Sequence, residues 1–271
     1  MIHRIHHLNC GTMCPFGGGL VSGGPLTEPA KLVCHCLLVE RPEGLVLVDT
    51  GLGLADMASP KARLGRSFVA LTRPRFDAED TAIRQIERLG FDPRDVRDVV
   101  VTHLDLDHAG GLSDFPEARV HVFAPEHRAA TSPPTLAERH RYRAAQFAHD
   151  PKWVVHELAG ESWEGFDAVR VLFDDVLLVP LTGHSRGHSA VAVRNGEGWL
   201  LHAGDAYFHQ NEMREPPSCP PGLAVFQIAL SFDERTRLEN QRRLRALVAE
   251  KSHVRVFSAH SPEELARLVS R

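Results

Sequence analysis

The chain has 271 residues, 43% of them hydrophobic, and a formal net charge of -4 at pH 7. This length and apolar content can bury one large core, so we expect a single domain over residues 1–271. The arginines are scattered, no apolar run approaches a membrane span, and the polar N-terminus does not resemble a signal peptide. We therefore predict a soluble cytoplasmic protein that binds neither nucleic acid nor a membrane.

The first fifty residues alternate apolar segments with glycine-rich turns. The strands predicted here are 2–8, 31–40 and 44–48. Arg41-Pro-Glu-Gly44 is a hairpin signal between the last two of them. Cys34 and Cys36 share one face of the 31–40 strand, and we expect small buried side chains there rather than a redox pair. The glycine-rich segment 10–24 is either a flap over a pocket or an ordered surface loop.

Residues 52–76 have little periodicity and predict a long irregular excursion, a lid or part of a substrate pocket. A helix is predicted over residues 77–89, ended by Gly90. Its apolar stripe is expected to contain Ile83, Ile86 and Leu89.

The most informative segment follows the apolar run Val99-Val-Val101, which predicts a buried strand. Four groups able to bind a metal come within six positions after Thr102, namely His103, Asp105, Asp107 and His108. Two imidazoles and two carboxylates buried this closely would repel one another or stay unsatisfied, whereas a divalent cation satisfies all of them. Gly110-Gly111 suits a backbone that turns tightly beside such a site.

The second half repeats groups of strands followed by helices. Further strands are predicted at 119–123, 169–173, 176–181, 190–194 and 198–201. Helices are predicted within 131–150, over 233–250 with Leu238, Leu244, Leu247 and Val248 inward, and after the capping box Ser261-Pro-Glu-Glu264. This pattern favours two β-sheets packed face to face with helices outside them.

His103-Leu-Asp-Leu-Asp-His108 resembles the HxHxDH signature of the metallo-β-lactamase fold superfamily, with Asp105 in place of the second histidine. The family's other motifs have counterparts in the same order: Val48-Asp-Thr-Gly51, Thr182-Gly-His-Ser-Arg-Gly-His188, Leu200-Leu-His-Ala-Gly-Asp205 and Val254-Arg-Val-Phe-Ser-Ala-His260. The resemblance covers nearly the whole chain. It implies an α+β fold, the four-layer αββα sandwich, as one metallo-β-lactamase-like domain.

The resemblance also implies a site for two divalent metal ions. One ion would be held by His103, Asp105 and His184, the second by Asp107, His108 and His260, with Asp205 bridging them. Asp49 would support a ligand histidine rather than bind metal. His188 would be a structural hydrogen-bonding residue.

Asp105 changes the expected charge of this site. The three carboxylates and a bridging hydroxide balance two divalent ions, so the cluster is expected to be neutral, with weaker Lewis acids than in a three-histidine site. Zinc is the expected metal. The harder carboxylate oxygen makes iron or manganese the alternatives at the site that contains Asp105.

The layout looks most similar to the N-acyl-homoserine lactonase-like branch. This implies a hydrolase in which a metal-bridging hydroxide attacks an ester-type carbonyl, with a lactone favoured and Asp107 passing the proton. The lactonases place a substrate-contacting tyrosine three residues after the bridging aspartate, where this chain has Phe208. Tyr207, one residue earlier, is our candidate for that catalytic contact.

Three alternatives stay open. The first is a thioesterase, similar to glyoxalase II, or another esterase. The second is a non-haem di-iron oxidoreductase, because flavin-linked members carry a carboxylate at the Asp105 position, although 271 residues leave no room for a flavodoxin domain. The third is a non-catalytic binding protein. In each case we expect a small-molecule partner, and a homodimer is left open.

Overall fold

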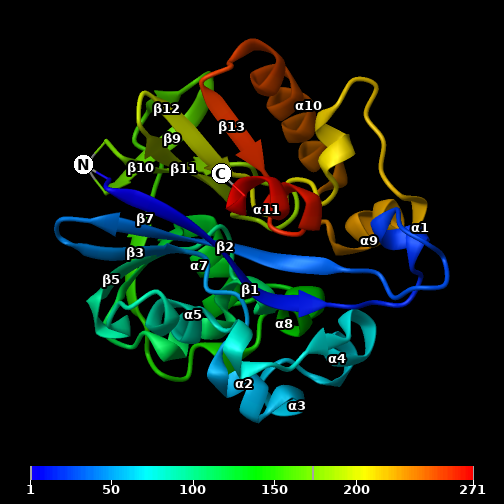
Figure 1. Cartoon of the computed structure of the whole chain (residues 1–271), viewed down its shortest axis with the longest axis horizontal. Helices are drawn as coiled ribbons and strands as arrows, with labels where there is room; N and C mark the ends of the chain where they lie inside the picture. The colour runs from blue at the N-terminus through cyan, green and yellow to red at the C-terminus, as the bar shows by residue number, and fades with distance from the viewer. Residues whose placement is uncertain (1, 173, 271) are drawn as a thin grey trace.

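The computed structural model describes residues 2–172 and 174–270. Within these residues the strands form a seven-stranded and a six-stranded sheet, and helices lie outside both (Figure 1). The predicted strand 169–173 ends at a residue outside this range. This is the predicted α+β fold with two packed sheets.

The first sheet has the strand order β4-β1-β2-β3-β5-β6-β7. Its strands are β1 (Arg4–Met13), β2 (Leu32–Arg41), β3 (Gly44–Val48), β4 (Pro74–Arg75), β5 (Val96–Val100), β6 (Arg119–Phe123) and β7 (Lys152–His156). The β2–β3 hairpin turns at the predicted position. Strands β3, β5, β6 and β7 run parallel, so the segments that follow their carboxyl ends leave the same edge of the sheet.

The second sheet has the order β13-β12-β11-β10-β9-β8. Its strands are β8 (Glu161–Trp163), β9 (Phe166–Leu172), β10 (Val176–Pro180), β11 (Ser189–Asn195), β12 (Gly198–His202) and β13 (Val254–Phe257). Neighbouring strands are antiparallel except β12 and β13, which are parallel. The carboxyl ends of β12 and β13 therefore lie together.

A core of aliphatic side chains lies between the two sheets. Leu37, Val48 and Val100 of the first sheet pack with Leu178 and Val191 of the second. Separate clusters cover the outer faces, under α5 (Ala82–Arg88) and α7 (Ala124–Thr131) on one side and under α10 (Glu234–Glu250) on the other. The layer order is therefore helix, sheet, sheet, helix.

Residues 52–76, predicted as irregular, instead form short helices and one short strand. The remaining helices of the chain are α1 (Gly19–Ser22), α2 (Leu54–Ala58), α3 (Pro60–Arg63), α4 (Arg66–Thr72), α6 (Leu106–Ala109), α8 (Leu136–Arg141), α9 (Pro221–Leu230) and α11 (Pro262–Val269). Helices of one or two turns are too short to display a 3.6-residue period, which explains the wrong prediction. The segment 131–150, predicted to be helical, contains the last residue of α7, the helix α8 and a 3-10 turn at 144–146, and its other residues are not helical.

Two helix faces also differ from their predicted faces. Leu238 is 42% exposed and Val248 39% exposed, although both were expected to face inward on α10. The buried stripe of α10 contains Arg237 and Gln241 as well as Leu244 and Leu247, and these polar groups pair with buried partners. Leu89, expected on the stripe of α5, is 42% exposed because the helix ends before it.

Among the residues that the structure describes, no helix is long and apolar enough to cross a membrane. The single-domain organisation and the cytoplasmic location stay predictions.

The inter-sheet core predicts a matched pair of stability effects. Leu178→Ala removes a side chain with 0% exposure and is expected to lower the free energy of unfolding by about 2–5 kcal/mol. Leu238→Ala, on the exposed face of α10, is expected to change it by less than about 0.5 kcal/mol. Urea unfolding of both variants measures this, and equal losses would contradict the assignment of the two faces.

Candidate metal centre

The seven predicted ligands lie at the carboxyl ends of four strands. Four of them follow β5, in the loop and the α6 turn: His103, Asp105, Asp107 and His108. His184 lies in the turn after β10, Asp205 follows β12 and His260 follows β13. Because strand ends of both sheets meet at one edge, side chains from position 103 to position 260 converge there.

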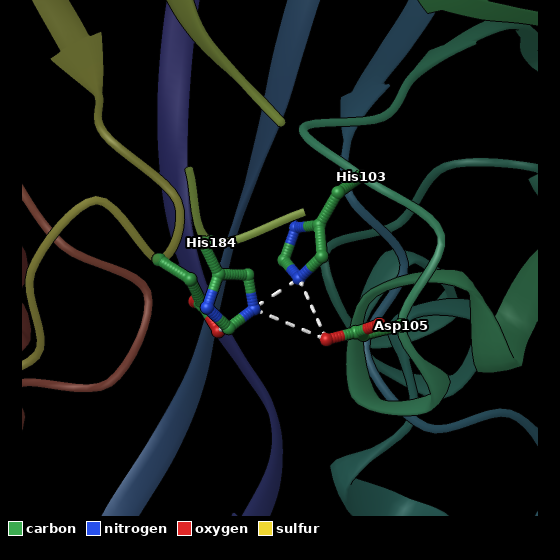
Figure 2. A group of neighbouring side chains, drawn as sticks. His103, Asp105 and His184 are labelled. Atoms are coloured by element: carbon green, nitrogen blue, oxygen red, sulfur yellow. Dashed lines mark hydrogen bonds and ion pairs between the residues drawn. The ribbon is translucent and has the colours of Figure 1, made fainter. Parts of the chain in front are cut away.

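The first group contains His103, Asp105 and His184, which point toward one another (Figure 2). Asp105 Oδ2 lies 3.3 Å from His103 Nε2 and 3.1 Å from His184 Nε2. His103 has 0% exposure and His184 1%, so both rings are closed off from solvent.

The second group contains Asp107, His108 and His260. His260 Nε2 lies 3.6 Å from Asp107 Oδ2. Asp205 lies between the groups: its Oδ1 is 3.2 Å from His108 Nε2 and 3.1 Å from His260 Nε2. Its Oδ2 is 3.3 Å from His184 Nε2 and 3.7 Å from His103 Nε2. The two oxygens of Asp205 therefore face both groups, as a bridging ligand must.

The donor atoms fit two metal ions. A tetrahedral ion with bonds of about 2.0–2.1 Å holds its ligands about 3.3 Å apart, which is the spacing observed in both groups. The Nε2 atoms of His103 and His108 and Oδ1 of Asp205 are buried without a hydrogen-bond partner. Buried polar atoms rarely stay unpaired, so their convergence indicates a site built for cations.

Asp49 fixes His108 from outside the cluster, as predicted. Its Oδ2 lies 2.8 Å from His108 Nδ1, and its Oδ1 accepts the Thr102 N–H at 2.7 Å. The Asp49 backbone has a φ of 55°, a conformation that aspartate tolerates better than most residues. A carboxylate on Nδ1 holds the Nδ1–H tautomer, which leaves Nε2 free to bind a metal.

His188 and a backbone carbonyl orient two further ligands. His188 Nδ1 donates to the Leu181 carbonyl at 2.9 Å, so its Nε2 accepts the Asp205 N–H, also at 2.9 Å. This is the structural role predicted for His188. His260 Nδ1 donates to the Val33 carbonyl at 2.7 Å, which directs its Nε2 into the cluster.

Glu126 is a supporting residue that sequence reasoning missed. This buried carboxylate accepts the Leu104 N–H at 3.0 Å, the Ser185 hydroxyl at 2.6 Å and the Gly187 N–H at 3.0 Å. It therefore ties the loop that carries His103 to the turn that carries His184. The sequence shows only a glutamate near the start of a helix, which has no distinguishing signal.

Arg141 is the second residue that the sequence did not single out. At the end of α8, its Nε donates to Asp105 Oδ1 at 2.5 Å and its Nη2 to Asp105 Oδ2 at 2.7 Å. Burial opposes ionisation of Asp105, but Arg141 and His103 outweigh it and hold its pKa well below its usual range. Burial, together with Arg141, lowers the pKa of His184 to about 4. The charge balance expected from the sequence, in which two divalent ions are neutralised by three carboxylates and a hydroxide, did not include the positive charge of Arg141.

The structure does not bring Tyr207 to the ligands, which corrects its catalytic assignment. Its hydroxyl is buried in the core under α10 and donates to Glu264 at 2.9 Å. Phe208 instead lines the cavity above the ligands, with its ring centroid 4.6 Å from that of His260. Adjacent side chains of this segment point to opposite sides, and the phenylalanine is the one that faces inward to the site.

A cavity of about 620 Å³ opens above the ligand cluster. Its polar lining contains the donor residues Asp105, Asp107, Asp205 and His260, together with Glu138, Arg141, Arg143 and Arg186. Its walls are mostly apolar, with Leu64, Phe68, Leu71, Phe208, Phe226 and Leu230 among them. The 52–76 segment thus supplies part of the pocket, as predicted, and Met13 of the 10–24 segment also lines it.

Comparison with known proteins agrees with this arrangement. The sequence profile of the Metallo-beta-lactamase superfamily matches residues 30–260. A probable metallo-hydrolase of Mycobacterium tuberculosis is 44% identical over 272 residues, covering 97% of this chain and 83% of that protein. An N-acyl homoserine lactonase of a Bacillus species is 25% identical and covers 88% of this chain and 84% of its own.

Solved structures share the fold. A crystal structure of Bacillus thuringiensis AiiA, a mutant with N-decanoyl-L-homoserine bound at the active site, has a TM-score of 0.74 at 22% identity, covering 98% of this chain and 96% of its own. AidC, a dizinc quorum-quenching lactonase in complex with a product, has a TM-score of 0.64 at 17% identity, and the match covers 97% of this chain and 90% of the AidC chain.

The geometry predicts metal content. We expect two divalent ions per chain after metal-replete purification, one for each donor group. Asp205→Ala removes the shared ligand and is expected to lower the content below that of the intact protein, because both ions lose a donor. Elemental analysis of dialysed protein measures this, and fewer than about one ion per intact chain contradicts the site.

Glu264 predicts a pH dependence of stability. Burial raises its pKa from 4.5 to about 7, so between these pH values the folded chain keeps a proton that the unfolded chain releases. The free energy of unfolding therefore falls as the pH rises through this window, by up to about 3 kcal/mol.

Glu264→Gln does not titrate and is expected to lack this fall. Urea unfolding of both proteins from pH 4.5 to 7 measures the difference. The ligand histidines contribute equally to the pH dependence of both proteins, so their contribution cancels in the comparison. Parallel curves would show that Glu264 is ionised throughout the window.

Proposed function

The chain belongs to the metallo-β-lactamase superfamily, and we propose that this metal-dependent hydrolase opens ester-type bonds, with an acyl-bearing lactone as substrate. The observation that carries the proposal is the cavity, whose mostly apolar lining also contains four of the proposed metal ligands, Asp105, Asp107, Asp205 and His260. Such a cavity suits a molecule with an apolar tail and one reactive polar group. Its volume lies within the range of about 300–1,000 Å³ that is common for small-molecule sites.

The metal assignments are part of the proposal. His103, Asp105 and His184 would hold one ion, Asp107, His108 and His260 would hold the other, and Asp205 would be shared between them. Zinc is our proposed metal because nitrogen and carboxylate donors at this spacing suit it, with iron or manganese as alternatives at the Asp105 site. When bound, the ions supply an ionised water at neutral pH and polarise the carbonyl oxygen.

Asp107 is our proposed proton carrier. It is one of four carboxylates that line the cavity, so a molecule bound there could contact it. A carboxylate that binds metal through one oxygen keeps the other for a proton. Asp107 would accept the proton of the attacking water and deliver it to the leaving oxygen as the ring opens.

The apolar walls favour an acyl chain on the substrate. Phe68 and Leu71 of α4 and Phe226 of α9 line the same cavity as the ligands. Burial of each methylene contributes about 0.8 kcal/mol, so an acyl chain along these walls would strengthen binding with length. The curated relatives named N-acyl homoserine lactonases also support this choice.

Three substrates separate the proposal from its alternatives. We expect turnover of a long-chain N-acyl homoserine lactone, with weaker or no turnover of a glutathione thioester and a cephalosporin. Turnover of the thioester alone would favour the thioesterase alternative. Bound iron with oxygen consumption would favour the oxidoreductase. Absence of turnover with any lactone would remove the proposed substrate class.

Acyl-chain length provides the sharper prediction. The ratio kcat/KM is expected to rise by up to about fourfold per added methylene between butanoyl and octanoyl lactones. Phe226→Ala is expected to flatten this rise because it removes a cavity wall. The matched control is Val225→Ala, a neighbour on α9 that is 66% exposed, and it should keep the rise. A flat length series in the intact protein would overturn the acyl-chain assignment.

A further inference from the structure

Asp105 and Arg141 form a pair that the superfamily signature does not contain. The signature has a histidine at the position of Asp105, and this chain has a carboxylate held by a guanidinium. The two hydrogen bonds are parallel, from Nε to Oδ1 and from Nη2 to Oδ2. This is the geometry that arginine, unlike lysine, provides to a carboxylate.

The pairing leaves Asp105 able to bind a metal. Its Oδ2 still lies 3.1 Å from His184 Nε2 and 3.3 Å from His103 Nε2, and it faces both imidazole rings of the first donor group (Figure 2). Each carboxylate oxygen has two lone pairs, so Oδ2 can accept from Arg141 with one and face the ion with the other.

Arg141 also holds a second ligand segment. Its Nη1 donates to the His184 carbonyl at 2.8 Å and to the Leu230 carbonyl at 2.9 Å. One guanidinium therefore fixes the side chain of Asp105, the backbone of His184 and the end of α9. Only 17% of the Arg141 side chain is exposed, and its bond to the His184 carbonyl is partly buried, whereas its bond to the Leu230 carbonyl is open to solvent.

The pair also changes the charge of the first group. An aspartate alone adds one negative charge where a histidine adds none, whereas an aspartate bound to an arginine adds no net charge. We propose that Asp105 and Arg141 act together in place of one neutral histidine ligand, with Arg141 as the residue that positions and charge-balances the first metal site. The proposal rests on the metal-dependent function above, but its test measures metal binding, not turnover.

The proposal predicts a different zinc affinity for Asp105→His than the donor types alone would predict. Histidine is a good zinc ligand, so Asp105→His by itself should preserve or improve the first site. If the pair is the functional unit, this variant leaves Arg141 as an uncompensated cation beside the ions. We expect Asp105→His to bind the first ion about 10- to 100-fold more weakly than Asp105→His/Arg141→Gln.

Arg186 provides a matched control. It lines the same cavity and pairs with a carboxylate, Glu138, at 2.5 Å, but none of its contacts is a ligand. Arg186→Gln removes the same charge from the cavity. Asp105→His/Arg186→Gln should therefore bind the first ion as weakly as Asp105→His does. If Arg186→Gln restored the affinity as much as Arg141→Gln, the effect would come from the general charge of the cavity, and the proposed role of the Asp105–Arg141 pair would be wrong.

The experiment is a zinc titration of the metal-free full-length proteins, read by calorimetry and by competition with a chromophoric chelator. Thermal unfolding of each metal-free protein checks that the variants fold. Cobalt(II) spectra report the donor set independently, and the double variant should show the spectrum of a histidine-rich first site. An Asp105→His protein that binds both ions as tightly as the double variant would overturn the inference and leave the proposed function intact. An intact protein that binds no zinc would overturn both.

Discussion

The structure depends on one electrostatic constraint, the convergence of buried histidine nitrogens and carboxylate oxygens on a small space. His103, His108, His184 and His260 all direct Nε2 toward Asp205. Burial raises the energy of every charged or unpaired group in this space, and hydrogen bonds inside the cluster cannot satisfy all of them. The strands and loops around the cluster therefore hold the donor atoms at positions where bound cations would satisfy them. The two sheets supply the rigidity, because the ligands follow strands whose inter-sheet faces are packed with aliphatic side chains.

Buried carboxylates outside the donor groups provide the next level of organisation. Asp49 accepts from Thr102 and fixes His108, and Glu126 joins the loop of His103 to the turn of His184. Both carboxylates are almost fully buried, and each is stabilised by backbone N–H groups rather than by a lysine or arginine. These hydrogen bonds leave the negative charge close to the ligands, and the bond from His108 Nδ1–H to Asp49 keeps the other ring nitrogen, Nε2, free of a proton.

Local pattern predicted most of the strands, and the resemblance to a known family predicted the donor residues, but neither identified the residues that act through distant contacts. His103, Asp107, His108, His184, Asp205 and His260 lie in short motifs with fixed spacing, and the strand ends bring them together. Arg141 lies in a segment without periodicity, and its partner is 36 positions away. The one available signal was indirect, since a carboxylate at a histidine position calls for a compensating cation.

Tyr207 was misassigned because spacing along the chain does not say which of two neighbouring side chains faces the cavity. The short helices of 52–76 were missed because one or two turns carry no period.

The contacts of Arg141 connect the wall of the cavity to the first donor group. Its Nη1 binds the carbonyl of Leu230, the last residue of α9, and α9 also carries Phe226 in the cavity wall. The same guanidinium holds Asp105 through Nε and Nη2. The end of α9 and the carboxylate of Asp105 therefore share one guanidinium, and its planar arrangement of donors sets their positions relative to each other. The helix that carries part of the apolar wall and the first donor group are in this way joined by one arginine.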